Sequence, residues 1–179
     1  MKRSMKFCGG ILLTLSLFCS SMTGLAGQGV ELTAGAGITE LFFVGARFPA
    51  SRAQIALSVG GFPQKGDQNM FAASGDIIYH FVDGRVYPDK LPIYAKAGLS
   101  YLKNKEDRST KEYLLLNTRA GLEYPLSSNT AIGVEGGVAF VLDEEEKLNP
   151  SHVSNGDFSL NFDFPFWPTA GVSFIYRIQ

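Results

Sequence analysis

Hydrophobic and polar residues alternate with a period of two along most of the chain. The segment AIGVEGGVAF, residues 131–140, is typical: one side is apolar, and the other carries small residues around the carboxylate of Glu135. After residue 27 no stretch has a convincing helical period. Alternating runs bounded by turn residues instead predict eight β-strands, at approximately 28–36, 39–48, 53–62, 69–81, 91–102, 112–124, 130–142 and 167–178.

Each predicted strand has one face without charged residues. That apolar face collects Leu32, Val44, Leu57, Ile77, Leu99, Leu122, Val134 and Val172, among others. The opposite face carries many Gly, Ala and Ser residues and a sparse set of ionisable ones. These are Glu31, Arg47, Asp76, His80, Lys96, Arg119, Glu123, Glu135 and Arg177. Setting the histidine aside, the cations and anions on this face balance.

Two architectures produce such a division, and they point opposite faces inward. A soluble barrel or sandwich would bury the apolar face and expose the polar one, but a water-facing surface is normally dense in long charged residues. Small residues with few, balanced charges fit the narrow interior of a closed eight-stranded barrel. The charge-free face then meets lipid. We therefore predict an all-β fold, an antiparallel up-and-down transmembrane barrel of eight strands, with the soluble barrel as the alternative.

Aromatic residues on the apolar face are sorted by height along the predicted strands. Two rings of them are expected, as in barrels of outer membranes. One ring is Phe48, Tyr79, Phe81, Tyr124 and Tyr176, on the periplasmic side if the mature chain starts there, and the other is Phe71, Tyr101 and Phe140. Most connections agree with this orientation. PASR and PLSSN are short turns, whereas KNKEDRSTK and the run from Asp143 to Phe166 read as external loops.

The N-terminus has the pattern of a secretory signal peptide. Basic residues precede an apolar run from Ile11 to Phe18, and small residues follow, which predicts cleavage after Ala26. The predicted mature domain, residues 27–179, loses both cysteines and three basic residues. It keeps 13 basic and 17 acidic residues, and this acidity argues against a nucleic-acid partner.

The closing segment AGVSFIYRIQ adds a family likeness. With the eight alternating strands, it resembles the small outer-membrane barrels of the OmpA-like transmembrane type. The resemblance covers the whole mature chain and implies a Gram-negative outer-membrane location, export through the cleaved signal, and insertion by the barrel-assembly machinery. Outer-membrane lipid and lipopolysaccharide are then its neighbours, and a monomer is expected. The chain ends in Tyr176-Arg177-Ile178-Gln179, where family members usually end on an aromatic residue.

The interior charges have a structural and a transport interpretation. In a narrow lumen unpaired charges are costly, so the four cations should pair with Glu31, Asp76, Glu123 and Glu135 and close the barrel. The alternative is a narrow, porin-like channel or carrier for small molecules. The structural interpretation predicts a non-enzymatic role in the cell envelope, structural or surface-interacting.

One motif supports an enzyme alternative. The segment HVSNG resembles the His-x-Ser-Asn motif of the outer-membrane lipid A deacylases, which implies His152 as the base and Ser154 as the nucleophile. The acid that this family places about a dozen residues later has no match, because Phe166 stands near that position and only Asp157 and Asp163 are close to it. Asn-Pro and Asn-Gly pairs around the motif favour a loop. No nucleotide motif or metal-ligand pattern is present in the sequence, so we expect neither cofactor nor metal.

Overall fold

The computed structural model describes residues 29–50, 52–63, 69–82, 92–105, 109–148 and 165–178. These residues form eight β-strands. The strands are β1 (Val30–Gly37), β2 (Leu41–Ala50), β3 (Ala53–Pro63), β4 (Asn69–His80), β5 (Ile93–Lys105), β6 (Ser109–Pro125), β7 (Thr130–Leu148) and β8 (Phe166–Ile178). The predicted signal peptide, residues 1–26, lies outside the described residues, so the cleavage site stays a prediction.

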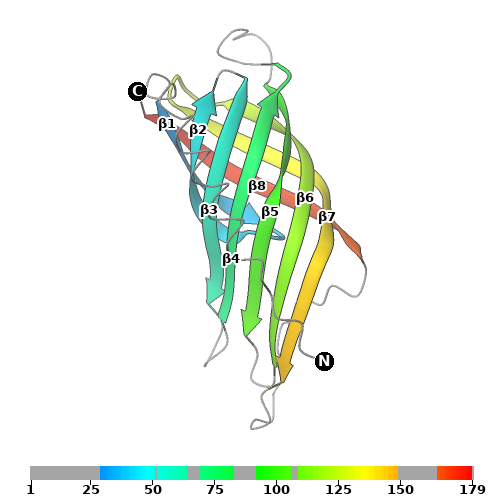
Figure 1. The fold of residues 1–179 in the computed structure, drawn as a ribbon. Helices are drawn as coiled ribbons and strands as arrows, with labels where there is room; N and C mark the ends of the chain where they lie inside the picture. The colour runs from blue at the N-terminus through cyan, green and yellow to red at the C-terminus, as the bar shows by residue number, and fades with distance from the viewer. Residues whose placement is uncertain are drawn as a thin grey trace, which may run out of the picture.

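The strands close into one barrel. Each strand pairs antiparallel with its neighbour in the sequence, and β1 closes the sheet against β8 from Val30↔Ile178 to Gly37↔Gly171. Figure 1 shows this wall of tilted strands around a single axis. Within the described part of the chain, no helix is long and apolar enough to cross a membrane. The predicted all-β barrel with antiparallel up-and-down topology is confirmed.

The two ends of the barrel differ. At one end, here called the termini end, β1 begins and β8 ends; the opposite end, called the distal end, lies at the bottom of Figure 1. At the distal end β6 and β7 extend much further than β1 and β2, with 17 and 19 residues against 8 and 10. A register shift between Leu114 and Leu115 interrupts the β6–β7 ladder near the start of this extension.

Two predicted loops are partly strand. The sequence predicts a loop over 103–111, but β5 continues to Lys105 and β6 begins at Ser109. It also predicts a loop at the acidic run Asp143–Glu146, but β7 continues through this run to Leu148. The outward residues are apolar only along the middle part of each strand, here called the apolar band, and beyond it neither face has to be apolar. The backbone ladder therefore continues after the alternation in the sequence has ended.

Side chains alternate between the outside and the inside of the barrel along every strand. Large apolar side chains on the outer wall are among the most exposed in the molecule, including Ile77 at 62%, Val44 at 60% and Val134 at 56%. The residues between them in the sequence are buried inside the barrel, among them Asp76, Arg47 and Ile78. The buried core of this protein is therefore the lumen, and much of it is polar.

Candidate functional site in the barrel interior

Nine charged side chains gather inside the barrel. Eight are the predicted interior residues Glu31, Arg47, Asp76, Lys96, Arg119, Glu123, Glu135 and Arg177, and the ninth is Glu40. Their side chains are at most 9% exposed, apart from that of Arg177 at 22%. Every one of the nine takes part in at least one ion pair, in two groups along the barrel axis.

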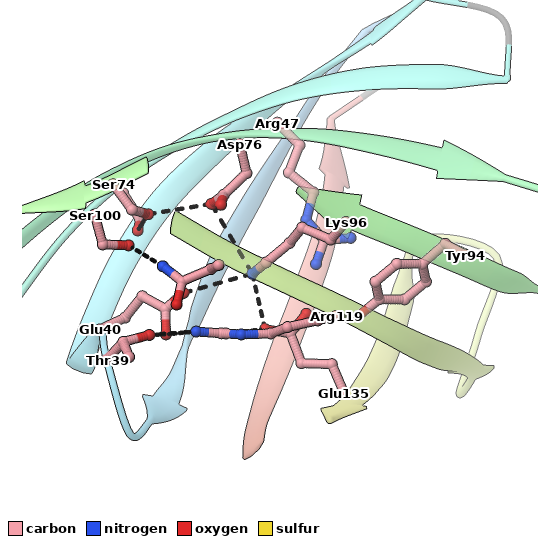
Figure 2. Close-up of polar contacts among 12 residues, drawn as sticks. Thr39, Glu40, Arg47, Ser74, Asp76, Tyr94, Lys96, Ser100, Arg119 and Glu135 are labelled. Atoms are coloured by element: carbon pink, nitrogen blue, oxygen red, sulfur yellow. Dashed lines mark hydrogen bonds and ion pairs between the residues drawn. The ribbon is translucent and has the colours of Figure 1, made fainter. Parts of the chain in front are cut away.

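The middle group is built around two cations from neighbouring strands. Figure 2 shows Arg119 of β6 and Lys96 of β5 converging on Glu135 of β7. Arg119 lies 2.5 Å and Lys96 2.7 Å from the same carboxylate oxygen of Glu135. Arg119 also reaches Glu40 at 2.8 Å, and Lys96 lies 3.6 Å from Glu40 and 3.9 Å from Asp76. Three carboxylates thus share two cations.

The second group lies nearer the termini end and has Glu123 at its centre. Arg47 donates to one oxygen of Glu123 at 2.6 Å, and Arg177 donates to the other at 3.3 Å. Arg177 also donates to Glu31 at 3.0 Å. The imidazole of His80 lies 3.5 Å from Glu123 through Nε2. Two cations and two carboxylates therefore balance here when the histidine is neutral.

Tyr94 of β5 connects the two groups. Its hydroxyl donates to Glu135 at 2.9 Å, and the guanidinium of Arg47 lies 6.0 Å from the centre of its ring, at the limit of a cation–π contact. Gly121 on β6 makes room for this ring, because a Cβ there would come within 2.3 Å of Tyr94 Cζ. The absence of a side chain at Gly121 is thus a requirement of the interior packing.

Sequence reasoning missed Glu40 and Tyr94. Strict alternation from Phe42 and Val44 would turn Glu40 outward, onto the apolar face. The structure instead has a turn at Ile38–Glu40, and Leu41 adopts a left-handed conformation with φ of 61°. This turn breaks the alternation and directs Glu40 inward, where its neighbour Thr39 accepts a hydrogen bond from Arg119. Tyr94 lies two residues before Lys96 on β5, so the two side chains share the inward face. The alternation counted from Lys96 was the one sequence signal for this position.

An apolar cluster fills the lumen at the distal side. It consists of the buried residues Met70, Ala72, Leu102, Tyr113 and Leu115, with Leu41, Val141 and Trp167 packed against it. Leu102 and Leu115 are completely buried although the lumen was expected to be polar. The ion pairs and this cluster therefore occupy successive levels of the described lumen.

The aromatic residues of the two expected rings face outward. Tyr79, Phe81, Tyr124 and Tyr176 are exposed on the wall near the termini end, and Phe48 is half-buried there. Near the distal end Phe71 and Phe140 are exposed and Tyr101 is half-buried. A stacked pair, Phe42 and Phe62 at 5.7 Å between ring centres, adds to the distal ring.

The distal extension carries its own charged ladder. Lys103 donates to Glu112 across β5 and β6 at 2.9 Å, and Lys147 of β7 lies 3.4 Å from Glu145 and 3.9 Å from Glu112. The hydrogen bond from Lys103, followed by one from Tyr101, holds the pKa of the Glu112 carboxyl below its usual value. Glu112 is half-buried, but the side chains of the two lysines and of Glu145 are exposed, so the ladder contributes little to stability.

The candidate hydrolase residues cannot be related to this site. His152 and Ser154 lie outside the described residues, so the structure does not test whether they could act as base and nucleophile. In the part of the chain that the structure describes, no group of three or more His, Cys, Asp or Glu side chains is arranged to hold a metal ion.

Known structures share this architecture. The chain is similar to the N-terminal β-barrel domain of Pseudomonas aeruginosa OprF, with a TM-score of 0.52 and 21% identity over 83% of this chain and 98% of that one. It is also similar to Neisserial surface protein A, with a TM-score of 0.47 and 10% identity over 83% and 94% of the two chains. No family model and no curated protein matches the sequence. The expected likeness to small eight-stranded barrels of the outer-membrane type is thereby confirmed at the level of the fold.

Proposed function

We propose that this protein is an integral outer-membrane barrel with a closed, charge-paired interior and a structural or surface-interacting role in the cell envelope. The observation that carries the proposal is the inverted distribution of side chains. Large apolar residues cover the outer wall, and the charged residues are buried in the lumen. A soluble monomer rarely exposes so much contiguous apolar surface, whereas a barrel wall in lipid requires it.

The remaining features support the same proposal. Two sets of aromatic residues face outward, with Tyr124 and Tyr176 in the set at one end and Phe71 and Phe140 in the set at the other. These two sets fit the two interfaces of a bilayer. The distal extension of β5, β6 and β7 would stand beyond the outer interface and present exposed charged residues to the surroundings. That extension is the surface we assign to contacts with other molecules.

A closed interior predicts that the barrel does not pass sugars. Vesicles that contain the reconstituted protein should swell in an isosmotic sugar solution no faster than protein-free vesicles, because buried ion pairs and the apolar cluster lie across the path through the lumen. A wide general porin serves as the positive control for the assay. Swelling at a rate that rises with the amount of this protein would contradict the closed interior and favour the channel alternative.

A non-enzymatic role predicts unchanged lipid A. Cells that overproduce the protein should contain lipid A of the same mass as cells that carry the empty vector, as measured by mass spectrometry. The Ser154→Ala variant should give the same spectrum. Loss of an ester-linked acyl chain with the unmodified protein, but not with Ser154→Ala, would instead establish the deacylase alternative.

A further inference from the structure

The outer wall carries a groove of about 590 Å³ where β8, β1, β2 and β3 lie side by side. It is lined by Phe174 and Tyr176 on β8 and by Leu57 and Val59 on β3, with Ala34 and Val44 on the strands between them. The register explains the hollow: Ala34 pairs with both Phe174 and Val44, so a single methyl group lies between larger side chains.

Apart from Tyr176, the groove offers no polar side chain. Thr33 and Ser58 contribute to its lining, but Thr33 is buried in the lumen and Ser58 shares a hydrogen bond with Ser74 of the neighbouring strand. The volume falls in the usual range of small-molecule sites, about 300–1,000 Å³. An occupant must therefore be apolar along its whole length, as a lipid acyl chain is and a peptide or a sugar is not.

The position of the groove fits one leaflet. From Ile178, the end of β8, to Phe174 is a strand distance of roughly 13 Å, and half of a bilayer's hydrocarbon core is about 15 Å. The groove therefore lies in the half of the band next to the termini end. In an outer membrane with the termini in the periplasm, that leaflet consists of phospholipid.

A cation lies beyond the groove toward the termini end, five residues before Leu57 in the sequence. Arg52 is exposed in the turn between β2 and β3, at the termini end of the strand that forms one side of the groove. Among the described residues of the connections at this end, it is the only charged one. A phosphate at the level of Arg52 would be attracted to the guanidinium while the attached chain runs up β3 toward Val59.

We propose that this groove binds one acyl chain of an anionic phospholipid from the periplasmic leaflet, with the lipid phosphate beside Arg52. The proposal rests on the membrane location proposed above. It identifies a retained lipid, which is distinct from the lipids that exchange freely around the rest of the wall.

The test counts the lipid that stays bound. The mature protein is reconstituted into vesicles of phosphatidylethanolamine and phosphatidylglycerol, extracted in mild detergent and analysed by native mass spectrometry. The unmodified barrel should retain a single phosphatidylglycerol. Ala34→Phe and Val44→Trp, which place larger side chains in the lining of the groove, should lower the retained fraction about tenfold, since losing the burial of a few methylene groups suffices for such a change. Arg52→Gln should abolish the preference for phosphatidylglycerol over phosphatidylethanolamine.

Leu122→Trp is the matched control, because it adds an aromatic ring to the outer wall on β6, away from the groove. It should retain lipid like the unmodified protein. Equal retention in all variants, no retention in the unmodified barrel, or a second copy of the chain in place of lipid would overturn the proposal. So would lipopolysaccharide as the retained species after extraction from cells. A barrel that stays in membranes but retains no lipid refutes only the groove, whereas a chain that does not integrate refutes the proposed function as well.

Discussion

Arg119→Met is expected to lower the free energy of unfolding by about 3–5 kcal/mol, the usual cost of removing one partner from a buried ion pair. The side chain of Arg119 is completely buried and holds Glu40 at 2.8 Å and Glu135 at 2.5 Å. Its loss leaves Lys96 as the single cation beside three carboxylates. Urea-induced unfolding of the reconstituted protein, followed by the fluorescence of Trp167, measures the change.

Two further variants make this result specific. Lys103→Met removes a cation whose side chain is 42% exposed, and it should lower the free energy of unfolding far less than Arg119→Met does. Adding Glu135→Gln to Arg119→Met should recover part of the loss, because one of the uncompensated carboxylates becomes neutral. If Arg119→Met costs no more than Lys103→Met, the interior network does not stabilise the barrel.

Val134→Arg is expected to cost about 2–4 kcal/mol if the wall at this position lies near the middle of a bilayer. The side chain of Val134 is 56% exposed, between Ile132 and Phe140 on the outward face of β7. On a protein in water, the same change at so exposed a position would lie within about 0.5 kcal/mol of zero. The two environments therefore predict clearly different unfolding free energies in vesicles.

The controls separate charge from size and position. Val134→Leu keeps the wall apolar and should have little effect. Ser128→Arg adds the same cation to an exposed turn between β6 and β7, outside the apolar band, and should be tolerated. Equal stability of Val134→Arg and Ser128→Arg would mean that Val134 does not face lipid.

The outer wall was predictable because, in the membrane location proposed above, lipid imposes one rule on every strand. Any charged residue at an outward position within the band is penalised, so alternation persists from Leu32 on β1 to Val172 on β8 and fixes which residues face inward. The same rule explains why the interior charges could be named from the sequence. The rule does not predict which interior charges form ion pairs with each other. Arg47 and Glu123, for example, are 76 residues apart and meet through the register of a closed barrel.

The features that could not be predicted lie where this rule does not apply. Glu40 reaches the lumen through a turn at which Leu41 has a positive φ, a conformation that no hydrophobic pattern indicates. Leu102 and Leu115 pack inside because the distal lumen admits apolar side chains as well as polar ones. The ends of β6 and β7 extend beyond the apolar band, where neither face is constrained.

The most direct test of the central claim, that the apolar face of this barrel meets lipid, is heat-modifiability combined with a carbonate wash. Membranes containing the mature protein are washed with alkaline carbonate, and the detergent extract is run on a gel unheated and boiled. The account predicts that the protein stays in the membrane and migrates differently after boiling, because the folded barrel resists the detergent until it is heated. Release by carbonate as a soluble periplasmic protein, with one mobility in both samples, would contradict it.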